Sequence, residues 1–406
     1  MQLPEFVELG DLLEPFSRRG IDLDLSRLQA ALAAAGHPEQ AYPAVQVAGT
    51  NGKGSICTML GSILQQAGIR SGLYRSPHLV SWCERIELNG RWISAAALRQ
   101  GLESWQPWGQ QQALTPFELL TGVAFSAFAA EGIELAVLEV GLGGRLDATT
   151  CHPDRRVLGI ANIGLDHCEH LGADLETIAA EKAGIFCPGA VAFSAAQVEP
   201  VARVLEAQAR ERGCRLEWVE PLNPQQPLGL LGEWQRSNGA VARAMARELA
   251  RQGWPISAAA IDQGLAMARW NGRLQRCRWQ GLELLIDGAH NPPAAEALRR
   301  SLDLLDAGTP RQWVLGIQAH KDGAAILRAL LAAGDQAQIV PIEGCRSWSA
   351  EALQQACPEL APQLQACSSL NEGLSQLRPG PGLPVLAGSL YLLGQAWNTL
   401  EIDTCS

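Results

Sequence analysis

The sequence predicts an α/β fold with a largely parallel sheet, divided into two domains. Apolar runs of strand length alternate with helix-like stretches along most of the chain. Their hydrophobicity is continuous rather than alternating, which is typical of strands covered by helices on both faces. A length of 406 residues exceeds one ordinary domain and suits two, each able to bury a core.

The strands are expected within the apolar runs, taken in chain order. These runs are PAVQVAG (43–49), LAVLEVG (135–141), RVLGIANIG (156–164), LELLIDGAHN (282–291), WVLGIQ (313–318), AQIVPIE (337–343) and PVLAGS (384–389). A Pro- and Gln-rich segment at 218–234 interrupts the alternation, and a new series of strand, turn and helix starts at Leu282. We therefore expect the domain boundary near Asn271 and Gly272, with domains 1–272 and 273–406.

The composition excludes several classes of function. With 32 Lys and Arg against 42 Asp and Glu, the net charge is −10, so no broad basic face for nucleic acid or anionic lipid is expected. The eleven cysteines are odd in number and never form a C-x-x-C pair, which argues against a disulfide framework or a zinc ribbon. The N-terminal segment carries acids throughout and no long apolar run. We expect a cytoplasmic, monomeric protein that acts on small molecules.

The stretch AVQVAGTNGKGS, residues 44–55, resembles a phosphate-binding loop with altered spacing. A standard loop, G-x-x-x-x-G-K-[ST], would place a glycine at Val47 and a hydroxyl at Gly54. A strand precedes the stretch and a helical pattern follows it, so the loop lies at a helix N-terminus, where backbone N–H groups and the helix dipole favour an anion. The predicted phosphate-binding residues are Gly49, Thr50, Asn51, Gly52, Lys53, Gly54 and Ser55.

Glu139 marks a second site, at the carboxyl end of the run LAVLEVG. Open α/β sheets place ligand-binding groups at such strand ends, and a carboxylate there can hold Mg²⁺, which prefers oxygen ligands. Taken by itself, Glu139 is equally compatible with a solvated cap of the strand. The Ser-Pro-His of 76–78, taken by itself, is compatible with a simple turn.

The loop G-T-N-G-K-G-S resembles that of the Mur ligase superfamily, and Gly54 after the lysine resembles its folate branch, folylpolyglutamate synthase with dihydrofolate synthase. Further segments resemble motifs of this family, namely LYRSPHLVSWCERIELNG (73–90), NIGLDHCEHLGADLETIAAEKAGIF (162–186) and IDGAHNPPAAEAL (286–298). The resemblance extends from Gly20 to about Tyr391. It implies a Mur-ligase-like P-loop α/β N-terminal domain and a smaller Rossmann-like α/β C-terminal domain.

The resemblance also implies a metal site and a catalytic set. Ser76, Glu139 and His167 would bind magnesium, with Lys182 as a carbamate that bridges to a second Mg²⁺. Lys53, Glu139, His167 and Lys182 form the implied catalytic set, while His170 either lies behind the metal ligands or is structural. From the residues alone, Lys182 is read as a lysine in the last turn of a helix that ends at Gly184, where the helix dipole favours a cation.

Four further residues are implied ATP contacts, namely Asn238, Arg273, Asp287 and His290. The residues after Asp287 predict a helix start, because Asn291 can cap the next helix and Pro292 suits its first position. The sequence departs from the family pattern at three positions: Trp234 replaces a His, Thr150 an Asn and His320 an Asp.

The pteroate side has weaker signals. The segments GIDLDLSRL (20–28) and TPFELLT (115–121) resemble family segments that help to form the pterin pocket. From its residues, TPFELL is a capped helix start with Pro at the first position. The implied pteroate contacts are Asp22, Leu23, Asp24, Thr115, Phe117, Glu118, Leu146, Asp147 and Ala148.

The implied activity is the ATP-dependent ligation of L-glutamate to dihydropteroate, to the γ-carboxylate of folate polyglutamates, or to both, through an acyl phosphate. We expect both. A Mur-type cell-wall amino-acid ligase is an alternative, opposed by Gly54, by the Ser-Pro-His motif and by EKAGIF. A P-loop nucleotide switch is a second alternative, but the chain has no guanine-reading N-K-x-D.

Overall fold

The computed structural model describes residues 3–20 and 22–402, so that Ile21 of the motif at 20–28 and Cys405 lie outside the described residues. The chain divides into two compact units. One runs to Gly229 and includes Arg236–Arg269, and the other consists of Leu230–Gln235 and the chain from Trp270 onward. The boundary of functional domains at 272 and 273 stays a prediction, to which the structure adds that Leu230–Gln235 packs with the C-terminal unit.

The N-terminal unit is built on one sheet with the strand order β4-β3-β2-β5-β1-β6-β7-β8. Its strands are β1 Ala44–Ala48, β2 Ser71–Tyr74, β3 Ile86–Leu88, β4 Arg91–Trp92, β5 Leu135–Glu139, β6 Arg155–Ile160, β7 Val191–Ala195 and β8 Arg215–Val219. All neighbours from β2 to β8 are parallel, and only the β2-β3-β4 edge is antiparallel. Strands β1 and β5 are buried throughout, as their continuous hydrophobicity predicts.

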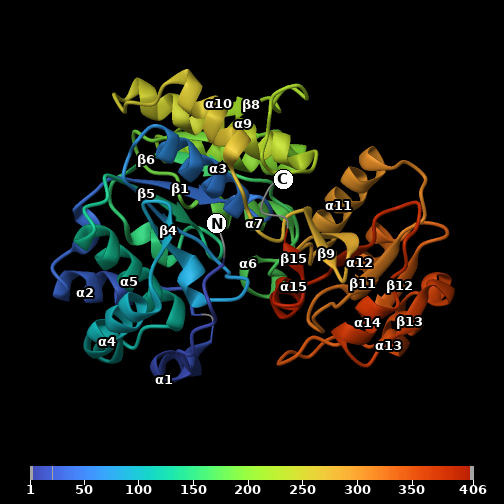
Figure 1. Ribbon diagram of the computed structural model, residues 1–406. Coiled ribbons are helices and arrows are strands. Elements are labelled where there is room, and N and C mark those ends of the chain that lie inside the picture. The colour runs from blue at the N-terminus through green and yellow to red at the C-terminus, as the bar shows by residue number, and fades with distance from the viewer. Residues whose placement is uncertain (1–2, 21, 403–406) are drawn as a thin grey trace. The chain divides into compact units, whose positions relative to one another are not determined.

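Helices cover both faces of this sheet (Figure 1). They are α1 Gly10–Leu13, α2 Ser26–Ala34, α3 Lys53–Gln66, α4 Ala95–Gln112, α5 Pro116–Ala130, α6 Cys168–Leu171, α7 Leu175–Ala183, α8 Glu199–Glu211, α9 Trp234–Arg251 and α10 Ala258–Met267. Short 3₁₀ segments are η1 Glu14–Arg19, η2 Pro38–Gln40, η3 Trp82–Arg85 and η4 Ala148–Cys151. Glycines in the strands admit the helices closely: a Cβ on Gly72 would meet Phe128 of α5, and one on Gly159 would meet Met245 of α9.

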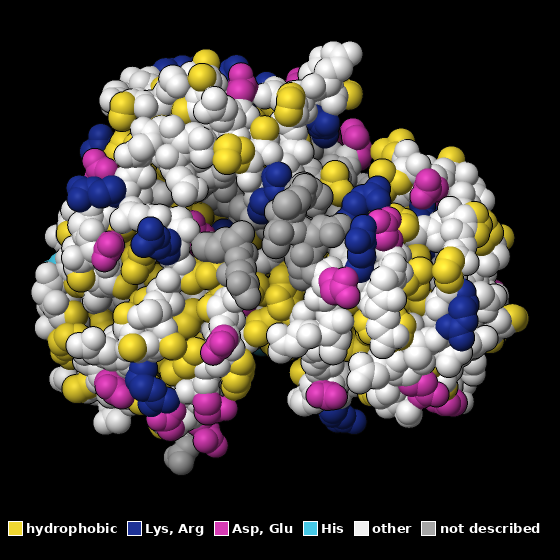
Figure 2. Space-filling view, in the orientation of Figure 1, with side chains coloured by type: hydrophobic (Ala, Val, Ile, Leu, Met, Phe, Trp, Pro, Cys, Tyr) yellow, Lys and Arg dark blue, Asp and Glu magenta, His cyan; other side chains and the backbone are white. Residues whose placement is uncertain are grey.

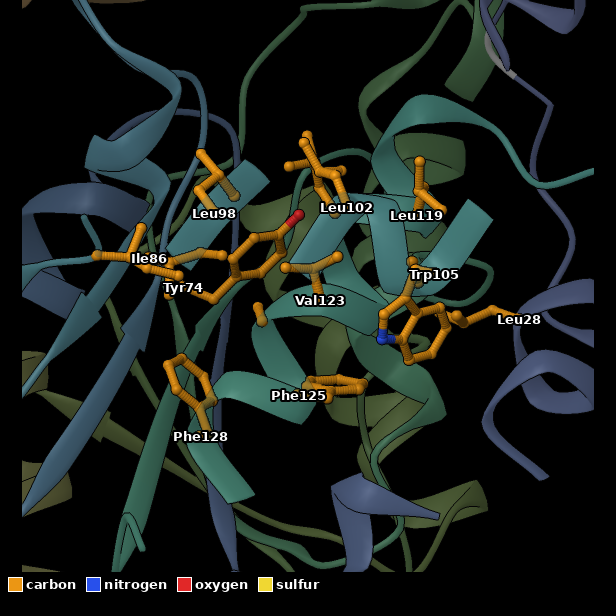
Figure 3. Packing of buried hydrophobic residues seen from close by; sticks show 14 of the residues in the cluster. Leu28, Tyr74, Ile86, Leu98, Leu102, Trp105, Leu119, Val123, Phe125 and Phe128 are labelled. Atoms are coloured by element: carbon orange, nitrogen blue, oxygen red, sulfur yellow. The ribbon is translucent and has the colours of Figure 1, made fainter. Parts of the chain in front are cut away.

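The largest core of this unit lies between α2, α4, α5 and the strands at the β2 edge (Figure 3). Leu28, Trp105 and Phe125 are fully or almost fully buried there and come from the three helices in turn. The Trp105 indole N–H donates to Ser126 Oγ (3.0 Å), so its one polar group is satisfied. This core fixes the N-terminus of α2 against α5, and the starts of these two helices adjoin two of the three segments with predicted pteroate contacts.

The C-terminal unit contains a second sheet with the order β13-β12-β11-β14-β10-β9-β15. Its strands are β9 Gln275–Trp279, β10 Leu282–Ile286, β11 Gln312–Leu315, β12 Gln336–Ile339, β13 Leu364–Ala366, β14 Val385–Ala387 and β15 Glu401–Ile402. Its helices are α11 Pro292–Leu305, α12 Gly323–Leu330, α13 Ala350–Ala356, α14 Leu370–Ser375 and α15 Leu390–Trp397, and η5 Pro358–Gln363 is a 3₁₀ segment. The strands from β13 to β10 are parallel, and β9 pairs antiparallel with both β10 and β15. The prediction of an α/β fold with largely parallel sheets is confirmed.

The surface and the cysteines agree with the composition. Lys and Arg are interspersed with Asp and Glu on the face that Figure 2 shows. No helix among the described residues is long and apolar enough to cross a membrane. Every cysteine in the described part of the chain is a free thiol.

The closest helix packing in the N-terminal unit depends on one glycine. A Cβ atom on Gly264 of α10 would lie 2.4 Å from the Cα atom of Ile63 in α3, the helix that follows the phosphate loop. We predict that Gly264→Ala lowers the free energy of unfolding by about 1–3 kcal/mol, because backbone cannot yield as a side chain does. Denaturant unfolding would measure this loss. The exposed neighbour Gln263 provides the control, since Gln263→Ala should change stability little; equal effects of the two substitutions would contradict the prediction.

Candidate active site

The phosphate loop joins β1 to α3, and it requires its glycines. Gly49 and Gly52 have φ values of 142° and 103°. A Cβ on Gly49 would lie 2.6 Å from Ala161 Cβ, and one on Gly52 would lie 2.3 Å from Asn238 Oδ1. Only glycine fits such a backbone at such contacts. Lys53 is the first residue of α3, so the loop lies at a helix N-terminus as predicted.

Two lysine amines converge on one carbonyl of this loop. Lys53 Nζ donates to Gly49 O (3.1 Å) and to Thr50 O (3.1 Å), and Lys182 Nζ donates to Gly49 O (2.9 Å). Lys182 is 4% exposed. Burial, and after it the positive charge of Lys53, lowers the pKa of the Lys182 ammonium to about 7. A large fraction of the Lys182 amine is therefore neutral at physiological pH.

Glu139 and Ser76 meet at the ends of neighbouring strands. Glu139 is the last residue of β5 and pairs with Val47 of β1, two residues before the phosphate loop. Its carboxylate is buried and accepts the backbone N–H of Ser76, with a distance of 3.1 Å from N to Oε2. This arrangement fits a hard divalent cation, which takes a few oxygen ligands and keeps waters and substrate phosphates.

The loop that carries His167 is hydrogen-bonded to the phosphate loop. Thr50 N donates to Asn162 O (2.7 Å). The Thr50 hydroxyl donates to Gly164 O and accepts the backbone N–H of Gly164. His167 precedes α6 with a φ of 51°, and its ring lies 3.9 Å from Glu169. Within residues 3–20 and 22–402, no three His, Cys, Asp or Glu side chains form a metal cluster. That is compatible with the predicted ligands, since only Glu139 and His167 are of these types.

The Ser-Pro-His segment is held by a carboxylate that the sequence prediction did not single out. Glu84 accepts the backbone N–H groups of Leu79, Val80 and Ser81, and completes a capping box with Ser81. The pattern Ser-x-x-Glu at 81–84 was the available signal. Burial and the nearby Arg85 lower the pKa of His78 to about 3, so this imidazole is neutral; its Nδ1 accepts Arg85 Nε (3.0 Å).

The predicted ATP contact Asn238 belongs to α9 and lies against Gly52, where a Cβ could not fit. Trp234, in place of the usual His, packs against the hydrophobic core of the C-terminal unit and shields Gly232. The indole therefore fills an apolar position. We therefore assign to Trp234 no polar role of the histidine that it replaces.

The C-terminal unit places Arg273, Asp287 and His290 around the end of β10. Asp287 is buried, and its two oxygens accept the backbone N–H groups of Leu274 and Ala289 at 2.8 Å each. Burial raises the pKa of this carboxyl, and the charge of Arg273 opposes the shift. Its geometry is that of a residue that orders the two loops. Asn291 caps α11 through Ala294 N, as predicted, and His320 lies exposed in a turn.

The predicted pteroate contacts fall into two kinds. Thr115 caps α5 in a box with Glu118, confirming the predicted helix start, and Phe117 stands beside Tyr74 with ring centroids 5.8 Å apart. Leu23 and Leu146 are half-buried. Asp147 and Ala148 are buried, and the Asp147 carboxylate already accepts the backbone N–H groups of Gly141, Leu142 and Thr149. A role of Asp147 in pteroate binding stays a prediction, and this geometry favours a role through the shape of the loop.

A buried polar network connects the loop after β5, which contains Asp147, to strands β1 and β6. The Gln46 amide of β1 donates to the hydroxyls of Thr149 (2.8 Å) and Thr150 (2.9 Å), and Thr150 donates to Gly144 O (2.7 Å). Arg155 donates to Gln46 Oε1 and to Ile185 O. Thr150 thus replaces the family Asn with a hydroxyl that is fully used. Sequence reasoning missed Gln46 and Arg155, although a polar residue in the middle of an apolar strand was a signal.

Such a phosphate loop and strand-end carboxylate, on a parallel sheet followed by a second α/β unit, define an ATP-dependent ligase of the Mur type. Residues 47–216 match the family described as Mur ligase middle domain, and residues 273–399 match the dihydrofolate synthetase C-terminal domain. The chain is 32% identical to the folylpolyglutamate synthase of Lacticaseibacillus casei, over 97% of this chain and 98% of that one, and 31% identical to a probable dihydrofolate synthetase of Schizosaccharomyces pombe, over 94% and 99%. The chain belongs to the folylpolyglutamate synthase and dihydrofolate synthase family, as its motifs predicted.

Solved structures agree with this assignment. The structure of E. coli FolC in complex with DHPP and ADP has a TM-score of 0.86 and 30% identity, with 98% of each chain covered. The bifunctional folylpolyglutamate synthase/dihydrofolate synthase of Yersinia pestis, complexed with AMPPNP and a Mn ion, has a TM-score of 0.84 and 28% identity, covering 98% of this chain and 99% of that one. Both are similar to this chain over both of its units.

Lys53 is the only cation in the phosphate loop 44–55, and its side chain is half-buried. We predict that Lys53→Ala lowers turnover about 10²- to 10³-fold, because it removes a cation from developing phosphoryl charge. Steady-state phosphate release measures the loss, and an unchanged thermal midpoint shows that the fold is intact. The control is Arg70→Ala, which removes an exposed cation of the same unit paired with Glu134. Turnover of Lys53→Ala close to that of the control would rule out the proposed phosphate contact.

Proposed function

We propose that this ligase joins L-glutamate both to dihydropteroate and to the γ-carboxylate of reduced folate polyglutamates, with ATP converted to ADP and phosphate. The observation that carries the proposal is the convergence of Lys53 and Lys182 on the Gly49 carbonyl, beside the buried pair of Glu139 and Ser76. Relatives named for each of the two activities cover nearly the whole chain, which supports a bifunctional enzyme. We expect the protein to act in the cytoplasm as a monomer.

The reaction requires no covalent bond to the protein. The carboxylate of the pteroyl substrate attacks the γ-phosphorus of ATP, ADP leaves, and an acyl phosphate forms. The amino group of glutamate then attacks the acyl carbon, loses a proton and displaces inorganic phosphate. Lys53 and the N–H groups of the loop neutralise charge on the phosphates, and the protein's remaining task is to align the two reactants. Asn238, Arg273, Asp287 and His290 are the further proposed nucleotide contacts, and Asp287 also holds the loop of Arg273 through Leu274 N.

Ser76, Glu139, His167 and a carbamate on Lys182 are the proposed ligands of two Mg²⁺ ions. When bound, the metal supplies positive charge to the phosphate oxygens. Glu139 offers a buried carboxylate, and the hydroxyl of Ser76 belongs to the residue whose N–H Glu139 already holds. A Mn ion accompanies AMPPNP in the Yersinia pestis relative, which supports a divalent cation here.

Phosphate release tests the proposed function directly. We predict that the protein releases phosphate from ATP only when glutamate and a pteroyl substrate are both present. The pteroyl carboxylate is needed to form the acyl phosphate, and glutamate is needed to displace phosphate from it. Dihydropteroate and a reduced folate monoglutamate are assayed in separate reactions, and the ligated product is identified by mass. Omission of glutamate or of the pteroyl substrate is the control. Equal phosphate release without either substrate would refute the ligase reaction, and activity with only one pteroyl substrate would refute bifunctionality.

A carbamate on Lys182 agrees with its surroundings. Carbamate formation requires CO₂ and a neutral amine, and a pKa of about 7 supplies that amine near neutral pH. An ammonium at this position would repel a cation bound by Glu139, whereas a carbamate replaces it with anionic oxygen ligands. The chain has only three lysines, Lys53, Lys182 and Lys321, so that single substitutions can test which of them carries the modification.

We predict a carbamate carbon signal when the enzyme with Mg²⁺ is incubated with ¹³C-bicarbonate and observed by NMR. The signal should increase as the pH rises through about 7, because the folded-state pKa of Lys182 is lowered and its neutral form is populated above that pH. Lys182→Ala should abolish the signal and lower activity about 10- to 100-fold, with partial recovery in acetate. Lys321→Ala, the control, should keep the signal. A signal that survives in Lys182→Ala, or full activity of that variant, would refute the carbamate.

A further inference from the structure

Arg27 joins two of the three segments that carry the predicted pteroate contacts, 22–24 and 115–118. Its guanidinium donates to Glu118 from both Nη2 (3.1 Å to Oε1) and Nε (3.4 Å to Oε2). It also donates to the carboxylate of Asp22 (3.0 Å), to the backbone carbonyl of Asp22 (2.7 Å) and to the carboxylate of Asp24 (3.4 Å). All three nitrogens of one side chain are therefore engaged, and the contact to Glu118 spans 91 residues of sequence.

The surroundings of Arg27 make these contacts stronger than those of a surface ion pair. The side chain of Arg27 is 13% exposed and that of Glu118 is 5% exposed. Paired donors from a planar guanidinium to one carboxylate fix orientation as well as distance. Three carboxylates surround this one cation, so its loss would leave Asp22, Asp24 and Glu118 to repel one another.

Helix stability does not account for an arginine at this position. Arg27 is the second residue of α2, where the helix dipole disfavours a cation. The helix is instead anchored by Leu28, Ala31 and Leu32, which are buried in the core with α4 and α5. The arginine thus works against its own helix, and the contacts that compensate all lie in the two motif segments.

The Arg27 contacts also determine which side chain of the second segment is left for a ligand. Glu118 is fully occupied, because it accepts Thr115 N (2.7 Å) as well as Arg27. Phe117, which directly precedes Glu118, is half-buried. Its ring lies against Gly141, where an added Cβ atom would be 2.5 Å from Phe117 Cζ. Gly141 begins the loop that contains Leu146 and Asp147. The start of α5 therefore sets the position of an aromatic face beside that loop.

We infer that Arg27 is a positioning residue for the pteroyl substrate: it locks the segment 22–24 to the start of α5 and so holds Phe117 and the acidic segment in the shape that binds the pteroyl group. The inference rests on the proposed function. It assigns to Arg27 no contact with ATP, glutamate or the reacting carboxylate. Its loss should therefore affect pteroyl affinity before it affects the nucleotide or the chemical step.

The test compares Arg27→Met with Arg99→Met. Arg99 is a matched control, because it also cross-links distant segments of the same unit, through paired contacts to Asp11 (2.8 and 3.2 Å) and one to Glu8 O, but touches neither motif segment. We expect Arg27→Met to raise the KM for dihydropteroate about tenfold or more, as the loss of charge-assisted hydrogen bonds would. The KM for ATP should change less than about twofold, and Arg99→Met should change neither.

Two further variants keep the test decisive if Arg27→Met folds poorly. Arg27→Lys retains the charge but lacks the paired donors, so we expect a smaller rise in the same KM. In a double-mutant cycle, Glu118→Gln and Arg27→Lys should raise this KM less than additively, since each disrupts the same contact. Equal rises in the KM for ATP and dihydropteroate, or a lower thermal midpoint with an unchanged KM for dihydropteroate, would show a merely structural role and overturn the inference. Wild-type protein that ligates no pteroyl substrate would overturn the proposed function as well.

Discussion

The site depends on one shared hydrogen-bond acceptor: the amines of Lys53 and Lys182 both donate to the backbone carbonyl of Gly49. Two ammonium groups so close would repel each other, and burial of Lys182 adds to that cost. The lower pKa of Lys182 relieves both penalties, because a neutral amine still donates a hydrogen bond. The phosphate loop is thereby attached to α7 through a group that can react.

Parallel strand order makes this contact possible. Strands β5, β1 and β6 are neighbours, so their carboxyl ends lie at one edge of the sheet. Glu139, the phosphate loop and the segment from Asn162 follow those three ends. Backbone hydrogen bonds then fix the segments to one another, with Thr50 bound to both Asn162 and Gly164. The parts of the site are therefore joined through main chain as well as through side chains.

Several buried carboxylates near the site hold loops in place through backbone hydrogen bonds. Asp147 and Asp287 each bind backbone N–H groups with both carboxylate oxygens, and Glu84 holds the turn after Ser76 in the same way. Buried carboxylates used like this order a loop at the cost of desolvation, which hydrogen bonds offset.

The sequence by itself determined the features that depend on neighbouring residues: the phosphate loop, the strand ending in Glu139, the caps at Thr115 and Asn291, and the parallel α/β class. Strands such as β4 and β15 have only two residues each, too few for any periodicity to reveal. Only the tertiary structure decided which distant groups meet. The contact of Lys182 with Gly49 spans 133 residues, and no local pattern encodes it. A contact between residues so far apart in sequence follows from the order and packing of the strands. The lowered pKa of Lys182 and the position of Arg27 have the same origin.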